Sequence, residues 1–205
     1  MDDIVSKEDR GRIGAAVKAA EAKTSGEIFV VVAQQSDDYR FIPILWATLV
    51  ALIEPLALIY ATSLPASIIY AMQLAAFVIL AFVLSLPSVR PQVVPSAIKH
   101  ARAKALAVQL FLAHGLHTTE ARTGVLIFVS LAERHAEIVA DTGIASRVDQ
   151  KTWDAAMAAL VAEIRAGRLA DGLLAAIDAT GAVLAKHFPR GIGDRDELPN
   201  ELVVL

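Results

Sequence analysis

A long apolar stretch constrains this chain more than any other feature. Between Arg40 and Arg90 only one side chain is charged, Glu54. Two apolar runs, 41–62 and 66–86, are separated by a turn of three residues. Each run has about 20 residues, or roughly 30 Å as a helix, which is enough to cross the core of a bilayer. Because the turn is short, the helices must be antiparallel neighbours, and we expect residues 41–89 to form a transmembrane hairpin.

The composition fits this interpretation and excludes several other classes of protein. The alternative is a hairpin buried in a soluble core, but a chain of 205 residues has too little mass to cover two such helices. The net charge of −3 shows no basic excess, so no nucleic-acid partner is expected. The chain has no cysteine, which excludes disulfides, thiolate metal sites and cysteine nucleophiles.

The positions of the basic residues predict which way the hairpin faces. All 19 lysines and arginines lie outside residues 41–89. Basic residues that flank membrane helices mark the cytoplasmic side. We therefore expect both termini and the soluble part of the chain in the cytoplasm. No secretory signal is predicted, because the first 40 residues are polar and amphipathic. The flanking basic residues are Arg40, Arg90, Lys99, Arg102 and Lys104.

The remaining sequence predicts an α/β domain that the hairpin interrupts. Strands alternate with helices, and the first two strands are joined through a helix, which is compatible with parallel pairing. The turn Ala132–Arg134 predicts that the second and third strands form a hairpin. Pro87, Pro91 and Pro95 predict an extended exit from the hairpin. We divide the chain into residues 1–40 and 90–188 for this domain, 41–89 for the hairpin and 189–205 for a flexible tail. The expected helices are 7–24, 97–114, 150–166 and 169–187, and the expected strands are 27–32, 124–131 and 135–140.

Three segments resemble the TPM domain family. They are Ser25–Val32, Arg122–Ile144 and Ile164–Ile177, in this order and spacing. The resemblance implies a small α/β sheet flanked by helices. It also implies a range of functions, since family members include a lumenal photosystem-repair protein and an auxiliary receptor subunit. Phosphatase activity and calcium binding have been suggested for some members. This chain differs in carrying an apolar hairpin after the first strand, where most members have a soluble connection.

Acidic residues near the predicted strand ends are candidate metal ligands. Asp141 follows the third strand, Asp149 lies across the next loop, and Glu120 precedes the second strand. Ligands in α/β sheets bind at the carboxyl ends of strands, and carboxylate oxygens suit Ca²⁺ or Mg²⁺. The alternative is that Asp149 caps a helix and Asp141 accepts hydrogen bonds from backbone N–H groups.

The five histidines do not predict a zinc site. His114 and His117 are three residues apart, but Gly115 is expected to end the helix between them. His135 is expected to point outward from its strand. No nucleophile elbow, phosphate-binding loop or dinucleotide fingerprint is present in the sequence.

Glu54 is the unusual residue of the hairpin, because ionisable groups inside membranes are costly and often functional. Counting along the helices places Glu54 and Gln73 at similar depth. One hypothesis is a hydrogen bond between them, or to a free backbone carbonyl near Pro55, that locks the helix register. The other is contact with a polar residue of a partner membrane protein.

Together these features predict a membrane-anchored interaction or assembly module at the cytoplasmic face of a bacterial inner (plasma) membrane. Its expected partners are the bilayer and either another membrane protein or a second copy of the chain. The alternative is a divalent-cation-dependent phosphatase that uses the acids at the strand ends. A minimal transporter component is a third possibility. Glu54 argues for it, and the presence of only two membrane helices argues against it.

Overall fold

The computed structural model describes residues 4–119, 121–149, 151–191, 199 and 201–205. The chain divides into two compact units. The first combines residues 1–36 with 100–205, and the second spans residues 37–99.

A mixed sheet forms the centre of the first unit. In the described part of the chain its strand order is β3-β2-β1-β4. The bounds are Glu27–Ala33 for β1, Gly124–Ser130 for β2, His135–Ala140 for β3 and Leu202–Val204 for β4. β1 pairs in parallel with β2 and β4, and β2 pairs antiparallel with β3. The expected α/β fold, with the first two strands parallel, is confirmed.

The two central strands are buried along their whole length. Both consist mainly of β-branched and aromatic residues without alternation of polar side chains, which is the pattern of a strand covered on both faces. Parallel strands cannot be joined by a tight turn and need a crossover connection. The crossover from β1 to β2 therefore has to contain everything between Ala33 and Gly124.

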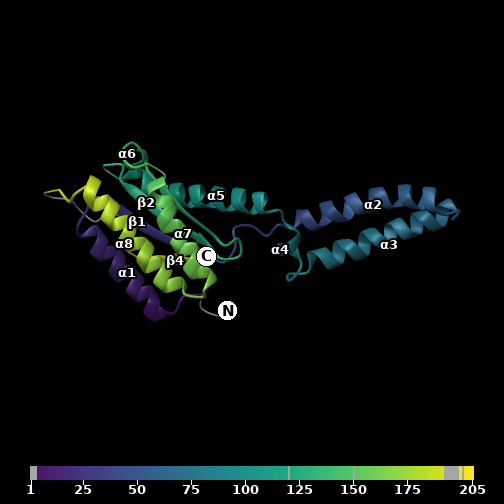
Figure 1. The fold of residues 1–205 in the computed structure, drawn as a ribbon, viewed down its shortest axis with the longest axis horizontal. Coiled ribbons are helices and arrows are strands. Elements are labelled where there is room, and N and C mark those ends of the chain that lie inside the picture. The colour runs from purple at the N-terminus through teal and green to yellow at the C-terminus, as the bar shows by residue number, and fades with distance from the viewer. Residues whose placement is uncertain (1–3, 120, 150, 192–198, 200) are drawn as a thin grey trace. The chain divides into compact units, whose positions relative to one another are not determined.

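Helices α1 (Lys7–Glu21), α7 (Lys151–Arg165) and α8 (Leu169–His187) pack on one face of the sheet. Figure 1 shows α1 and α8 side by side. Ser6 caps α1, since its Oγ accepts a 3.0 Å hydrogen bond from Asp9 N, as expected from the sequence. The helices bury an apolar stripe against the even-numbered residues of β1 and the odd-numbered residues of β2. The main helix residues of this stripe are Ile13, Val17, Trp153, Met157, Leu160, Leu173, Ile177 and Leu184.

Helix α5 (Ser96–Ala113) packs on the opposite face of the sheet. Its inner stripe consists of Ala103, Ala107 and Phe111, which lie against Phe29 and Phe128 among other residues. The small alanines let the helix approach the large aromatic side chains of the strands. A short 3₁₀ helix, η1 (Leu116–Thr118), follows α5 and leads into β2.

One expectation for the C-terminus is wrong. Residues 189–205 were expected to form a flexible tail, but Leu202–Val204 forms β4 beside β1. Residues 192–198 and 200 of this expected tail lie outside the described residues. Val30, Val31 and Val32 of β1 are the partners of this strand. A short apolar segment close to an unpaired sheet edge gains backbone hydrogen bonds there, and the tripeptide was too short to produce a strand pattern in the sequence.

The second unit is a helical hairpin of α2 (Phe41–Ala61) and α3 (Ala66–Ser85). Both helices are long and apolar enough to cross a membrane. Only 22% of the most apolar window of α2 and 6% of that of α3 are buried, which argues against a soluble core hairpin. The exit is not extended as expected, because Arg90–Val93 forms one helical turn, α4. Pro91 fits there because the first turn of a helix needs no N–H from proline.

The close crossing of α1 and α8 yields a test with a matched control. A Cβ at Gly181 would lie 2.7 Å from Ala20 Cβ, whereas a Cβ at Gly11 would have no neighbour within 4 Å. Both glycines lie inside helices, so both alanine variants gain up to about 1 kcal/mol of helix propensity. We expect Gly181→Ala to destabilise the protein by about 1–3 kcal/mol through overpacking, and Gly11→Ala to be neutral or stabilising. Thermal unfolding of the two variants measures the difference, and equal melting temperatures would contradict this packing.

Candidate functional site

The direction of β3 decides which residues meet at each edge of the sheet. Because β3 is antiparallel to β2, Ala140 at its end pairs with Val125, and His135 at its start pairs with Ser130. The carboxyl ends of β1 and β2 therefore lie beside the beginning of β3. Asp141 lies at the opposite edge, where its backbone N–H donates to Gly124 O at 2.9 Å. Asp141 follows the third strand as expected, and the predicted hairpin of β2 and β3 is confirmed. Because β3 is antiparallel, however, its end lies beside the beginning of β2 and away from the carboxyl ends of β1 and β2.

Asp141 acts as the cap of a short helix, α6 (Thr142–Ala145). Its side chain is 5% exposed, and Oδ1 accepts hydrogen bonds from Thr142 N at 2.6 Å and Thr142 Oγ1 at 3.1 Å. Arg122 Nη1 lies 3.8 Å from the other carboxylate oxygen. A Cβ at Gly143 would lie 2.5 Å from Arg122 O, so only glycine allows this close contact between α6 and the loop before β2.

The other two predicted metal ligands do not join Asp141 in the described structure. Asp149 is exposed, and its Oδ1 accepts a 3.1 Å hydrogen bond from Lys151 N at the start of α7. Glu120 lies outside the described residues. Across the described residues no group of three or more histidine, aspartate or glutamate side chains is placed to hold a metal ion. The Ca²⁺ or Mg²⁺ site stays a prediction.

A polar network occupies the opposite edge, at the carboxyl ends of β1 and β2. Glu133 accepts hydrogen bonds from Ser36 N, at 3.2 Å to each carboxylate oxygen, and from the hydroxyl of Ser130. Ser36 Oγ and Ser130 Oγ are 2.8 Å apart. Ser130 and Glu133 are buried. The network ties the end of β1 to the turn between β2 and β3, and the sequence analysis missed it because none of these residues belongs to a recognisable motif.

Two histidines meet at the same edge. His100 Nδ1 and His135 Nδ1 are 3.2 Å apart, and His135 Nε2 lies 3.1 Å from Glu137 Oε2. His100 precedes Ala103 on the inner stripe of α5, so the helix presents it to β3. His135 was expected to point outward from its strand, and the structure shows that its side chain contacts His100 of α5. No local pattern in the sequence links the two histidines.

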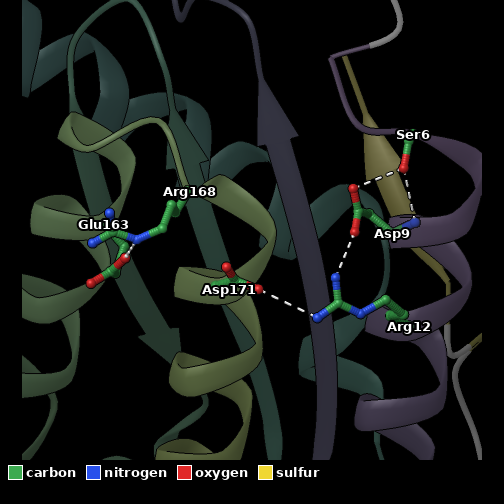
Figure 2. Close-up of polar contacts among 6 residues, drawn as sticks. All are labelled: Ser6, Asp9, Arg12, Glu163, Arg168 and Asp171. Carbon is green, nitrogen blue, oxygen red and sulfur yellow. Dashed lines mark hydrogen bonds and ion pairs between the residues drawn. The ribbon is translucent and has the colours of Figure 1, made fainter.

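A separate polar pocket of about 350 Å³ lies between the start of α1 and the connection from α7 to α8. Figure 2 shows Arg12 reaching from α1 to α8. Its Nη1 donates to Asp9 Oδ1 at 2.9 Å, and its Nη2 donates to Asp171 Oδ1 at 3.3 Å. The hydrogen bonds to Asp9 and then Asp171 raise the pKa of Arg12. The arginine is therefore engaged by acids of this same chain.

The second arginine of this pocket is paired in the same way. Arg168 Nε donates to Glu163 Oε2 at 2.6 Å (Figure 2). This bond lowers the pKa of Glu163 and raises that of Arg168. Because folding lowers the pKa of Glu163, any stabilisation from this pair is present above the carboxyl pKa of the unfolded chain. It is lost as the pH falls through the carboxyl pKa of the folded protein. Because both groups are exposed, solvent screens the pair, and we interpret this pocket as a surface with local ion pairs.

Within the hairpin, Glu54 and Gln73 are both partly buried. Glu54 Oε2 is buried and has no hydrogen-bond partner among the described residues, so the expected bond from Gln73 is not made to this oxygen. Gln73 instead lines a pocket of about 220 Å³ between the two helices, together with Thr48 and Tyr70 among others. The hairpin therefore contains polar groups that its own two helices leave available.

A family model described as TPM domain, and named TPM phosphatase, matches residues 88–183. The chain carries a TPM domain. The match begins after the apolar hairpin and contains α5, β2, β3 and most of α8. It confirms the resemblance seen in Arg122–Ile144 and Ile164–Ile177, whereas β1 and the hairpin lie outside the matched residues.

The TPM-domain chain also has a structural neighbour. It is similar to the NMR structure of the BA42 protein from the psychrophilic bacterium Bizionia argentinensis, with 21% sequence identity and a TM-score of 0.64. The alignment covers 100% of this chain and 98% of that chain. At this identity the likeness shows the fold alone. Among curated proteins, none matches the chain.

The two aspartates that were expected to bind metal yield a stability test. Asp141 is a buried cap with two hydrogen bonds, whereas Asp149 is an exposed cap with one. We expect Asp141→Ala to lower the free energy of unfolding by about 1–2 kcal/mol and Asp149→Ala by about 0.5 kcal/mol. Thermal or denaturant unfolding in metal-free buffer measures both losses. A larger loss of unfolding free energy in Asp149→Ala than in Asp141→Ala would contradict this ranking of the two caps.

Proposed function

We propose that this TPM-domain chain is a membrane-anchored interaction or assembly module that acts at the cytoplasmic face of a bacterial inner membrane. The observation that carries the proposal is the exposed apolar surface of α2 and α3. Large apolar side chains are exposed along both helices, among them Leu52, Ile53, Leu56, Ile79 and Phe82. Soluble proteins rarely expose a contiguous apolar patch of this kind, and a bilayer would cover it.

The charge pattern supports the proposed orientation. Residues Phe41–Ala61 and Ala66–Ser85 and the turn between them contain neither lysine nor arginine, whereas Arg40 directly precedes the first helix and Arg90 follows the second by five residues. Arg40 and Arg90 both lie at the open end of the hairpin, on the same side of the proposed membrane. By the positive-inside rule this side is cytoplasmic, so the TPM domain lies in the cytoplasm.

The roles of the acidic residues favour an interaction module over an enzyme. Asp141 and Asp149 each cap a helix, and among the described residues no cluster of three acids or histidines could hold a metal ion. Glu54 and Gln73 offer polar groups within the apolar hairpin. Polar groups at membrane depth form interhelical hydrogen bonds, so the proposed partner is another membrane helix with a polar side chain, or a second copy of this chain.

A divalent-cation-dependent phosphatase is the second candidate, and the name of the matching family model favours it. This activity needs several carboxylates around one Ca²⁺ or Mg²⁺ ion. Asp141 supplies one buried carboxylate beside Arg122, a residue that could hold a phosphate oxygen. The candidate therefore depends on further acids that approach Asp141.

The absence of cysteine makes the membrane topology directly testable. We expect Ser63→Cys, in the turn of the hairpin, to react with a membrane-impermeant maleimide in intact cells. Gly11→Cys, in α1, should react only after the inner membrane is permeabilised. Both positions are exposed, so the labelling difference reports the side of the membrane. Wild-type protein without cysteine is the control for background labelling.

Labelling of Ser63→Cys only in broken cells would contradict the proposed orientation. Extraction of the wild-type protein by alkaline carbonate, which removes peripheral proteins, would contradict membrane insertion itself.

The role of Glu54 separates assembly from simple anchoring. We expect the wild-type protein in mild detergent to migrate as a complex larger than the monomer. Glu54→Gln should keep this complex, because an amide still forms hydrogen bonds. Glu54→Leu should reduce the assembled fraction about threefold or more, since an interhelical hydrogen bond contributes roughly 0.6–2 kcal/mol. Native gels and cross-linking measure the fraction, and a monomer in all three variants would overturn the assembly proposal.

A further inference from the structure

The contact between His100 and His135 has a defined proton arrangement. Glu137 Oε2 lies 3.1 Å from His135 Nε2, and a carboxylate can only accept a hydrogen bond. In the neutral form of His135 the proton is therefore on Nε2. Its Nδ1 keeps a free lone pair, and this atom lies 3.2 Å from His100 Nδ1. The carboxylate thus fixes a tautomer in which one imidazole lone pair is directed towards the second imidazole.

This separation is the one expected of two ligands on a single metal ion. Two imidazole nitrogens bound to one tetrahedral Zn²⁺, each at roughly 2.0–2.1 Å, lie about 3.3 Å apart. A histidine that binds a metal commonly donates its other N–H to a carboxylate, as His135 does to Glu137. We propose that His100 and His135 bind one Zn²⁺-type transition-metal ion through their Nδ1 atoms, with Glu137 as the residue that positions His135.

The surroundings of the two histidines let a metal ion enter from solvent and keep open coordination positions. His135 and Glu137 are 18% and 17% exposed, whereas His100 is exposed to solvent. The site thus has one sheltered ligand on β3 and one accessible ligand on α5. With two protein ligands, the remaining coordination positions are open to water or to an exchangeable ligand.

The location of the site agrees with the general rule for α/β sheets. His135 pairs with Ser130, the last residue of β2, so the histidine pair lies at the carboxyl edge of the parallel strands. Ligands of such sheets bind outside these strand ends. Nitrogen ligands favour Zn²⁺, Cu²⁺ or Ni²⁺ over Ca²⁺ and Mg²⁺, which separates this site from the acids predicted as ligands near Asp141. The inference does not depend on the proposed membrane function.

The competing interpretation is a plain hydrogen bond, in which His100 Nδ1–H donates to His135 Nδ1. It needs the same separation of the two nitrogens but leaves no free lone pair on either Nδ1 atom for a metal. The two interpretations differ in whether added metal displaces the proton on His100. Metal binding by the intact protein therefore decides between them.

The test is a titration of the full-length, untagged protein in detergent at about pH 7.5, after removal of metal by a chelator. Zn²⁺ is the probe, and a chromophoric competitor reports its affinity. We expect one Zn²⁺ per chain and a rise in melting temperature on binding. His100→Gln and His135→Gln should each weaken binding at least tenfold, and Glu137→Gln should weaken it about tenfold. Millimolar Ca²⁺ or Mg²⁺ should not compete.

Two controls keep the outcome interpretable. His187→Gln removes a histidine near the end of α8 and should leave the affinity unchanged. His100→Gln alters an exposed side chain, so its melting temperature without metal should equal that of the wild type. Co²⁺ bound in place of Zn²⁺ should give a visible spectrum that His100→Gln abolishes. Equal Zn²⁺ affinity in wild type, His100→Gln and His135→Gln, or no binding at about 1 mM Zn²⁺, would overturn the proposal and leave the histidine hydrogen bond.

Discussion

The parallel pairing of β1 with β2 is the constraint on which the rest of the TPM-domain unit depends. Both strands are apolar and buried along their length, so each face of the pair needs its own cover. Helices α1, α7 and α8 supply one cover, and α5 supplies the other. The pairing also requires a crossover connection, because parallel strands start at the same edge of the sheet.

This crossover is where the apolar hairpin is inserted. The connection has to leave the end of β1, pass over one face as α5 and return to the start of β2. Lengthening such a connection costs little free energy, since the entropy of loop closure grows only with the logarithm of its length. The hairpin residues form their own compact unit, in which Trp46 Nε1 donates to Val93 O and Arg90 Nη1 donates to Asp38 O. The insertion therefore leaves the sheet register intact.

The antiparallel β3 determines which chemistry reaches each edge. It places Asp141 beside the start of β2, where the carboxylate caps α6. It places His135 beside the end of β2, where His100 from α5 and Glu137 complete a cluster. If the strand direction were reversed, the acids would occupy the ligand-binding edge. The two candidate sites thus follow from one topological choice.

The sequence by itself determined the elements whose signals are local. The lengths of the apolar runs predicted α2 and α3, and the apolar run at Glu27–Ala33 predicted a fully buried strand. Ser6 and Asp9 predicted the start of α1. Each signal depends on neighbouring residues and on burial, which a single segment can encode. For the candidate site, the hydrogen bonds agree with the alternative in which Asp149 caps a helix and Asp141 accepts from a backbone N–H, whereas the metal site stays a prediction.

Only the tertiary structure decided which distant residues meet. The pairing of Leu202–Val204 with β1 and the contact of His100 with His135 both join segments that are separated in the sequence. His100 belongs to no motif in the sequence, and His135 was expected only to point outward from its strand. Their chemistry arises from the register between a helix and a strand, and such a register depends on the packing of the whole core rather than on any local pattern.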